Sequence, residues 1–278
     1  MPVGWRTILA ALIISAIAGT ALIFARSSAN EVTLQFLVEG DSGASIDLDA
    51  RLFEPRGAGP FSAVVLMHGC SGWHGSNITD WASWFEKRGF IALMVDSFGP
   101  RGVSGVCGDP LKARPTPRTR AQDAYGALNY LSQLPTVDAG RVVLMGFSHG
   151  GTTAVVAAGT NAGRGVSNGV PRFAAVVAMY PWCGLGPGGF SEPVLPTLIV
   201  VGERDDWTPA GLCLERESAY DSLEVHVVPG ATHSFDIFRW KGEPVTPRNF
   251  QGHRLVPSRK ATKDARQTVD GFLRSHAL

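Results

Sequence analysis

The chain has 278 residues, a length that fits one large domain or two smaller ones. Hydrophobic residues make up 45% and charged residues 18%, an ordinary globular balance that excludes a disordered or fibrous chain. Lys and Arg number 25 against 24 Asp and Glu, so the net charge is +1 and nucleic acid is not expected as a partner.

The N-terminal segment carries a long uncharged run. Residues 8–25 contain no charge, with Arg6 before them and Arg26 after them. The run is just long enough to span a bilayer, somewhat long for a signal-peptide core, and lacks the polar face of a buried helix. We therefore expect residues 1–29 to export the protein, as a cleaved signal peptide or an uncleaved membrane anchor. Residues 30–278 would form one soluble domain in the periplasm or outside the cell, held to the membrane only through that segment.

The body of the chain alternates between strands and helices. It opens with two apolar-alternating stretches, residues 31–40 and 45–55, whose short polar connection indicates a hairpin. Buried strands are then expected at residues 63–67, 90–95, 142–145, 174–179, 197–201 and 225–228. Helices are expected at residues 77–87, 119–134, 148–158, 210–220 and 259–276, with a long loop at 99–118. This order predicts an α/β fold with a mostly parallel central sheet, helices on both faces, and a site at the carboxyl ends of the strands.

The segment GFSHGG places Ser148 in a G-x-S-x-G motif. A serine hydroxyl is a weak nucleophile that must be exposed beside a base, and a sharp strand-to-helix turn provides that exposure. Here the motif follows a buried strand and opens a helix, which favours a nucleophile elbow. The alternative is a glycine-rich turn in which Ser148 only caps the helix.

An acid and a base should follow the serine in that order along the chain. Asp205 and Asp206 both qualify, because they come directly after the strand at 197–201. His233 is the expected base, since it lies in a loop just after a strand. The other candidates lie within a strand, in a polar loop and in the tail: His226, His253 and His276.

Two backbone N–H groups are needed to hold the negative oxygen of a tetrahedral intermediate. One should come from His149, the residue after the nucleophile, and the other from the loop after the strand at 63–67. Counting from the end of that strand, the N–H of Cys70 is the expected second donor.

These segments together resemble the dienelactone hydrolase family of α/β-hydrolases. The matching stretches are VVLMHGCSG, the strand ending in Val95-Asp96, GFSHGG, GERDDWTP and PGATHSF, and the resemblance covers about residues 45–275. It implies the α/β-hydrolase fold and hydrolytic activity. It also places the acid on Asp205 rather than Asp206, the base on His233, and the oxyanion donors on Cys70 and His149.

The chain departs from the family pattern at several positions. Ser148 stands where the namesake enzymes have a cysteine nucleophile, and Gly69 stands where they have a carboxylate. Ile237 replaces an arginine that holds the substrate carboxylate. Arg101 could lie near a second substrate-binding arginine of the family. The resemblance therefore carries over the fold and the catalytic residues, but not the dienelactone substrate.

Four cysteines show no C-x-x-C and no zinc-like spacing, and three disulfide pairings are open from the residues alone. The family fold makes the third and fourth strands neighbours, and the sixth and seventh. It thereby implies Cys70–Cys107 and Cys183–Cys213, with four free thiols as the alternative.

Two tryptophans, Trp182 and Trp207, follow predicted strand ends on the same rim as Ser148. They would form a flat apolar wall of a substrate pocket, or else simply pack the loops. With Gly69 and Ile237 in place of charged groups, such a wall favours neutral or aromatic esters.

The leading hypothesis is thus an exported serine hydrolase that acts on carboxylic esters, with lactones left open. The expected partner is a small-molecule ester, the chemistry requires no metal or cofactor, and the oligomeric state is undecided. One alternative keeps the same side chains but cleaves amides or peptides, or transfers acyl groups. Another is a non-catalytic binding protein on the same fold.

Overall fold

The computed structural model describes residues 30–37, 45–110, 112–159, 171–185 and 190–278. The predicted export segment, residues 1–29, lies outside the described residues. Within the described ranges, no helix has both the length and the apolar character needed to cross a bilayer.

A single eight-stranded sheet forms the centre of the molecule, with the order β1-β2-β4-β3-β5-β6-β7-β8. Its strands are β1 (Asn30–Leu37), β2 (Ser45–Phe53), β3 (Phe61–Met67), β4 (Ile91–Asp96), β5 (Val137–Phe147), β6 (Ala175–Met179), β7 (Thr197–Gly202) and β8 (Leu223–Val228). β1 and β2 form the expected antiparallel hairpin, β2 joins β4 antiparallel, and the strands from β3 to β8 run parallel. The predicted α/β class with a mostly parallel sheet is confirmed.

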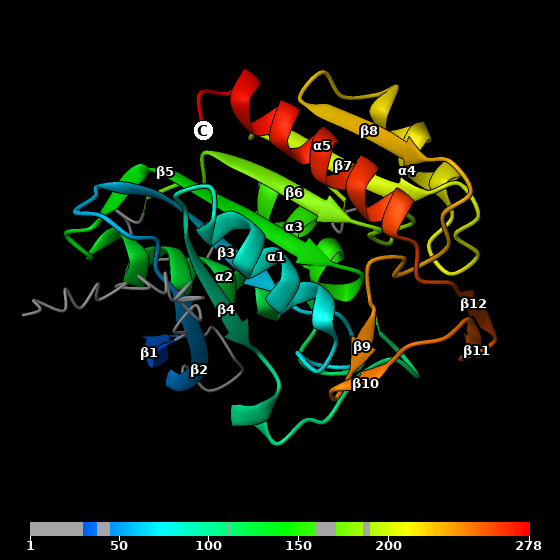
Figure 1. The fold of residues 1–278 in the computed structure, drawn as a ribbon, viewed down its shortest axis with the longest axis horizontal. Coiled ribbons are helices and arrows are strands. Elements are labelled where there is room, and N and C mark those ends of the chain that lie inside the picture. The colour runs from blue at the N-terminus through cyan, green and yellow to red at the C-terminus, as the bar shows by residue number, and fades with distance from the viewer. Residues whose placement is uncertain (1–29, 38–44, 111, 160–170, 186–189) are drawn as a thin grey trace, which may run out of the picture.

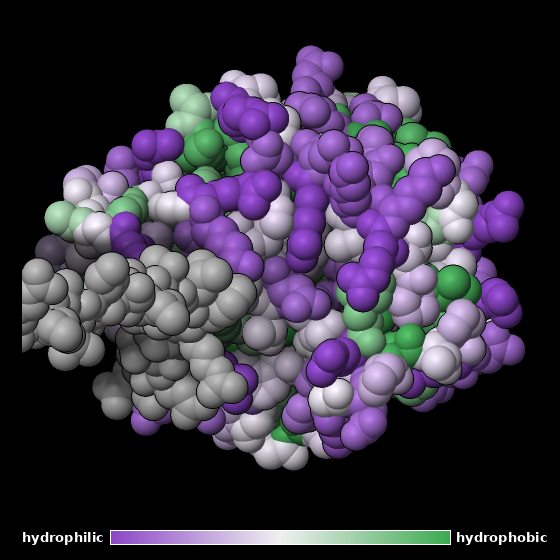
Figure 2. Space-filling view, viewed as in Figure 1, coloured by the Kyte–Doolittle hydropathy of each residue, from purple (hydrophilic) through white to green (hydrophobic). Residues whose placement is uncertain are grey.

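Helices cover both faces of the sheet, with α1 and α5 in front and α2 and α3 behind in Figure 1. The helices are α1 (Ser76–Glu86), α2 (Pro117–Ser132), α3 (His149–Ala158), α4 (Ala210–Glu217) and α5 (Arg259–Ser275), together with the short 3₁₀ helix η1 (Gly99–Arg101). The outward side of α5 is hydrophilic in Figure 2, while its apolar residues are buried against the sheet.

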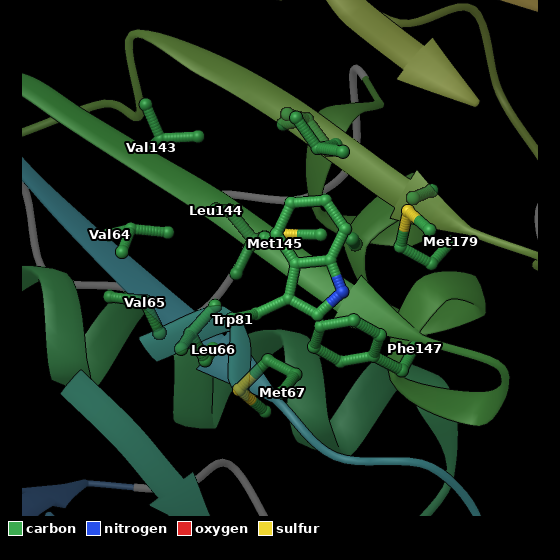
Figure 3. Packing of buried hydrophobic residues seen from close by; sticks show 14 of the residues in the cluster. Val64, Val65, Leu66, Met67, Trp81, Val143, Leu144, Met145, Phe147 and Met179 are labelled. Carbon is green, nitrogen blue, oxygen red and sulfur yellow. The ribbon is translucent and has the colours of Figure 1, made fainter. Parts of the chain in front are cut away.

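Continuous apolar runs explain the central strands, because a strand covered on both faces needs no polar side. Every residue of β4, β6 and β7 is buried. Figure 3 shows the indole of Trp81, from α1, packed over this layer close to Phe147. The two ring centroids are 6.3 Å apart. The hydrophobic core therefore extends to the end of β5, directly before the predicted nucleophile Ser148.

Several boundaries differ from the sequence expectation for local reasons. α2 begins at Pro117, two residues early, because Pro is well suited to the first turn and the Thr116 hydroxyl caps the N–H of Thr119. β5 is longer than residues 142–145 because it begins at Val137, which pairs with Phe61 of β3 ahead of an irregularity in the register. The expected loop at 99–118 contains η1 as well as the start of α2.

Two short hairpins lie between β8 and α5, where the pattern predicts a loop that includes residue 253. They are formed by β9 (Arg239–Trp240) with β10 (Glu243–Pro244), and by β11 (Arg248–Phe250) with β12 (His253–Leu255). Strands of two or three residues show no alternation. Their turns have positive φ at both central positions, as type I′ turns do, but with Lys241 and Gln251 where Asn or Asp would be the usual signal.

Two disulfides, Cys70–Cys107 and Cys183–Cys213, are present in the structure, and these are the pairings implied by the family fold. The Cα atoms lie 4.9 Å and 5.1 Å apart. The first bond joins the loops that follow β3 and β4, and the second joins the segment after β6 to α4. Both therefore fasten loops at the carboxyl edge of the sheet, where the site is expected.

Candidate active site

Ser148 occupies a sharp turn between β5 and α3. Its backbone has φ 52° and ψ −115°, a strained conformation that an L-residue adopts at few positions. The turn is possible because its flanking glycines have no side chain. A Cβ on Gly146 would overlap the carbonyl of Gly150, and one on Gly150 would overlap the carbonyl of Met67. The strand and helix can therefore approach closely and lift the hydroxyl above the sheet, as the elbow hypothesis requires.

The structure brings Ser148, His233 and Asp205 together in one line of contacts. The Oγ of Ser148 lies 2.9 Å from Nε2 of His233. Nδ1 of the same ring lies 2.8 Å from Oδ2 of Asp205. With the proton on Nδ1 donated to the carboxylate, Nε2 is left free to accept the serine proton.

Asp205 is 5% exposed and its carboxylate accepts four hydrogen bonds. Oδ1 accepts the backbone N–H groups of Trp207 and Thr208, and Oδ2 accepts the Thr208 hydroxyl and the His233 ring. Burial raises the pKa of Asp205, but His233 and the Thr208 donors more than offset it, so the pKa stands below its usual value. The carboxylate is thus charged at neutral pH. Asp206, the other sequence candidate, is exposed and lies 3.4 Å from the His253 ring instead.

A buried polar network supports the other face of His233. The ring of Tyr180 packs edge-on against the imidazole, with centroids 4.9 Å apart. Its hydroxyl donates to Asp236 at 2.7 Å, and Asp236 also accepts the Trp81 indole N–H at 2.9 Å. Burial and the neighbouring Asp236 hold the pKa of Tyr180 well above its usual value, so the phenol remains a neutral donor.

The two predicted oxyanion donors flank Ser148. His149 is the first residue of α3, so its N–H has no acceptor within the helix. Cys70 lies in a tight turn closed by a hydrogen bond from Gly72 N–H to Gly69 O, which leaves the Cys70 N–H outside the turn's own bond. The Cys70 carbonyl accepts from Val106 at 2.7 Å, and its sulfur is bonded to Cys107. The loop is therefore fastened on its outer side.

Behind these donors lies Arg120, a fully buried residue of α2. Its guanidinium donates to the backbone carbonyl of His68 at 2.8 Å and lies 2.6 Å from Nδ1 of His149. Burial, with the Arg120 charge adding to it, holds the pKa of His149 well below its usual value, so that ring is neutral and can accept. Burial lowers the pKa of Arg120 to about 9, which still leaves the guanidinium charged at neutral pH.

Ser148 lies where two cavities meet. The first, of about 260 Å³, is called here the hairpin cavity, and its apolar walls include Ile237, Trp240, Val245, Phe250, Leu255 and Pro257, together with Phe147, Tyr180 and Trp207. The second, of about 270 Å³, is called the α3 cavity, and its walls include Pro110, Lys112, His149, Thr152, Trp182 and Thr208. Cys70, Ser148 and Trp207 line both cavities.

Of the three residues proposed to bind substrate, the structure places two at the cavities and one away from them. Trp207 lines both cavities and Trp182 lines the α3 cavity, so both lie beside Ser148 as expected. Arg101 lines neither of the two cavities. Its guanidinium makes two 2.8 Å hydrogen bonds to the buried carboxylate of Asp123, which needs a cation to compensate its burial. The substrate-binding role considered for Arg101 is therefore corrected to a structural one.

Some residues of the site carry no sequence motif. Trp240 and Arg248 line the hairpin cavity from the two short hairpins, and Arg120 contacts the oxyanion segments from a helix distant in sequence. Tyr180 is a partial exception, because a polar aromatic residue directly after a buried strand is a sequence feature that could have marked it as a site residue. Within the described residues, no group of three or more His, Cys, Asp or Glu side chains is arranged to hold a metal ion.

Comparison with known proteins agrees with the fold. A family model described as the dienelactone hydrolase family matches residues 48–276. A probable 2-oxo-3-(5-oxofuran-2-ylidene)propanoate lactonase from a Bradyrhizobium species is 28% identical over 223 residues, which is 74% of this chain and 87% of the relative.

Solved structures show the same architecture at low identity. The α/β hydrolase GrgF from a Penicillium species superposes with a TM-score of 0.60 at 16% identity, covering 89% of this chain and 99% of that one. Esterase 2 of Thermogutta terrifontis, in a form phosphoramylated by tabun, gives a TM-score of 0.58 at 17% identity, covering 87% and 94%. These likenesses show the α/β-hydrolase fold.

Proposed function

The chain belongs to the dienelactone hydrolase family, and on this premise we propose that it is an exported serine hydrolase that cleaves carboxylic esters. The observation that carries the proposal is the line of contacts from Ser148 through His233 to Asp205, at 2.9 Å and 2.8 Å. His233 and Asp205 are buried, whereas Ser148 opens onto both cavities. Such an arrangement activates one hydroxyl and exposes it to a substrate.

In the first half of the reaction, Ser148 Oγ attacks the ester carbonyl while Nε2 of His233 takes its proton. Asp205 keeps the ring in the required tautomer and stabilises its charged form. The backbone N–H groups of Cys70 and His149 hold the oxygen that becomes negative. The tetrahedral intermediate then collapses, the ester C–O bond breaks, and Nε2 gives the proton to the departing alcohol.

In the second half, water replaces the alcohol. Nε2 of His233 takes a proton from the water as its oxygen attacks the acyl carbonyl, and the same two N–H groups hold the new oxyanion. When the acyl–serine bond breaks, the proton returns to Ser148 Oγ and the carboxylic acid leaves.

A fluorophosphonate probe tests whether Ser148 is activated, because only a serine with a functioning base reacts readily with it. The tabun adduct of the Thermogutta terrifontis esterase 2 supports an organophosphorus probe as the choice. We expect labelling of the purified full chain at Ser148 and no labelling of the Ser148→Ala variant. A folded wild-type protein that resists the probe would instead support a binding protein on this fold.

The alternative activities are separated by the acceptor and the bond cleaved. Matched amide and ester substrates with the same acyl group compare amidase with esterase action. Adding a competing alcohol distinguishes acyl transfer to that alcohol from acyl transfer to water. We expect ester hydrolysis to exceed both other activities.

For the substrate, we propose that uncharged and aromatic esters are preferred over carboxylated lactones. Gly69 and Ile237 bring no charge to the hairpin cavity, and Arg101 is held by Asp123. Arg248 lines that cavity but is exposed, so water and salt screen its charge. The measurement is kcat/KM for an uncharged aryl ester and for a carboxylated lactone. A higher value for the lactone would contradict this preference.

Export is part of the same proposal. It is supported by the uncharged run at residues 8–25 and by the presence of two disulfides, which persist in oxidising compartments. Cell fractionation followed by N-terminal sequencing of the recovered protein tests it. Recovery in the cytoplasm with residues 1–29 intact would contradict it.

A further inference from the structure

The two cavities that meet at Ser148 are similar in volume but differ in their relation to the proton donor. His233 lines the hairpin cavity and is absent from the lining of the α3 cavity. His149, an oxyanion residue, lines the α3 cavity and is absent from the lining of the hairpin cavity. The base is therefore on one side of the nucleophile, and one oxyanion residue is on the other.

The departing alcohol must leave from the side of His233, because Nε2 of this ring delivers the proton to its oxygen. We propose that the hairpin cavity holds the alcohol portion of the ester and that the α3 cavity holds the acyl portion. This assignment rests on the proposed serine hydrolase function. The reason is that the oxygen of the departing alcohol must receive its proton from Nε2 of His233.

The walls indicate which groups each cavity accepts. The hairpin cavity is bounded by Ile237, Trp240 and Phe250, so it favours an apolar or aromatic alcohol. The α3 cavity has Trp182 and Trp207 as walls, so it favours an apolar acyl group that can lie against an indole. Each cavity is slightly smaller than the roughly 300 Å³ at which pockets for whole ligands begin, so each suits one part of a substrate. The substrate class is an open-chain ester with apolar groups on both sides of the ester bond.

The order of bond breaking makes the assignment testable. The alcohol leaves when its C–O bond breaks and Ser148 Oγ becomes acylated, before water attacks. The rate of acylation therefore depends on both portions of the ester, whereas the rate of deacylation depends on the acyl portion alone. A residue that contacts only the alcohol has lost its substrate contact before deacylation, so its substitution should leave the deacylation rate nearly unchanged.

Two tryptophans provide matched variants, because Trp240 lines only the hairpin cavity and Trp182 only the α3 cavity. Burst kinetics with aryl esters would measure acylation and deacylation separately. For Trp240→Ala, we expect roughly tenfold slower acylation with a bulky alcohol, and deacylation within about twofold of wild type. For Trp182→Ala, we expect deacylation to change and the preference among acyl lengths to shift by roughly tenfold, with the ranking of alcohols preserved.

The opposite pattern overturns the assignment: deacylation that changes in Trp240→Ala, or a ranking of alcohols that changes in Trp182→Ala. If either alanine variant fails to fold, Trp240→Phe and Trp182→Phe make the same comparison with smaller changes. A failure of the proposed function has a different signature. In that case wild-type protein would show neither a burst nor fluorophosphonate labelling, whatever the ester.

Arg120 carries a second inference, since it links both segments that supply the oxyanion N–H groups. Its guanidinium contacts the His68 carbonyl, two residues before Cys70, and the side chain of His149. It lines neither cavity, so it does not meet the substrate there. We propose that Arg120 is a positioning residue that fixes the spacing between the two oxyanion donors.

The test compares Arg120→Lys and Arg120→Met with Tyr125→Phe, which removes a different buried hydrogen bond of α2, to the Ala157 carbonyl. For Arg120→Met we expect kcat to fall about 100-fold, as when one oxyanion donor is lost, with KM within about threefold. The inhibition constant of a boronic acid, which forms a tetrahedral adduct on Ser148, should rise in parallel with the loss in kcat. Arg120→Lys should recover part of both.

Tyr125→Phe should lower the melting temperature without changing kcat or boronate inhibition. A folded Arg120→Met protein with wild-type kcat and boronate affinity overturns the positioning role. If that variant does not fold, Arg120→Lys decides the question, because a single ammonium cannot reproduce both contacts of the guanidinium. Unchanged kcat and boronate affinity in a folded Arg120→Lys would overturn the role in the same way.

Discussion

Replacing Asp205 with Asn tests how the acid orients His233. In the wild-type structure, Oδ1 accepts the backbone N–H groups of Trp207 and Thr208 at 2.9 Å and 2.7 Å. Those N–H groups cannot donate to an amide nitrogen, so the variant's amide oxygen must stay at this position. Its NH₂ group then takes the place of Oδ2 and faces Nδ1 of His233.

The consequence is a change of tautomer in the imidazole. With a donor facing it, Nδ1 has to accept, so the ring proton moves to Nε2. A protonated Nε2 cannot take the proton of Ser148 Oγ, 2.9 Å away. A wrong tautomer of this kind costs about four orders of magnitude in kcat, which corresponds to about 5 kcal/mol of transition-state stabilisation. The backbone bonds to Oδ1 are kept, so the variant should fold.

The matched control is Asp206→Asn, since the sequence alone leaves both carboxylates open. Asp206 is exposed and contacts His253 rather than His233, so kcat should stay within about twofold of wild type. The assay is turnover of an aryl ester, with thermal melting to verify folding. Retention of more than about a tenth of the wild-type kcat in Asp205→Asn, or an equal loss in Asp206→Asn, would refute the reasoning.

Three further outcomes are expected. Ser148→Ala should melt like wild type and lose at least about three orders of magnitude in kcat; activity above a tenth of wild type would mean another nucleophile. Gly150→Ala should cost roughly 3 kcal/mol of unfolding free energy and most of the activity, because its Cβ meets the backbone of β3; an unchanged melting temperature would contradict this. Burial raises the pKa of Asp96, but the His68 ring and two backbone N–H groups bring it to about 2, below the ordinary 3.8. A lowered pKa stabilises the fold above pH 3.8 and the contribution is lost as the pH falls toward 2, so wild type should lose more stability than Asp96→Asn between pH 5 and 2 in acid-unfolding measurements; equal losses would contradict the shift.

The sequence predicts those parts of the molecule that depend on local patterns. Buried strands can be recognised in the sequence as apolar runs. The turn around Ser148 can be recognised because its flanking glycines allow the strand and the helix to approach closely. His233 could be selected because the other late histidines lie in a strand, a polar region and the tail. The choice of Asp205 over Asp206 needed the family pattern, since adjacent residues share every local property and differ only in the direction of their side chains.

The parts that sequence reasoning missed depend on contacts between distant residues. Arg248 and Trp240 reach the site through hairpins whose strands are too short to show alternation. Arg120 has the pattern of an ordinary helix residue, and only the packing of α2 against the oxyanion segments gives it a role. For Arg101, the sequence suggested a substrate-binding role where the structure shows an ion pair with Asp123. That partner lies 22 residues away and no motif marks the pair.

Most of the apolar walls of the hairpin cavity come from one contiguous stretch, residues 237–257, which contains neither Ser148, Asp205 nor His233; Phe147, Tyr180 and Trp207 supply the rest. The α3 cavity is instead assembled from separate loops and a helix that also support the nucleophile. On one side of the ester bond, selectivity can therefore be changed largely by grafting a single segment between β8 and α5. On the other side it can change only through dispersed substitutions that also disturb the catalytic residues. Divergence within such a lineage should run faster in the alcohols released than in the acids formed.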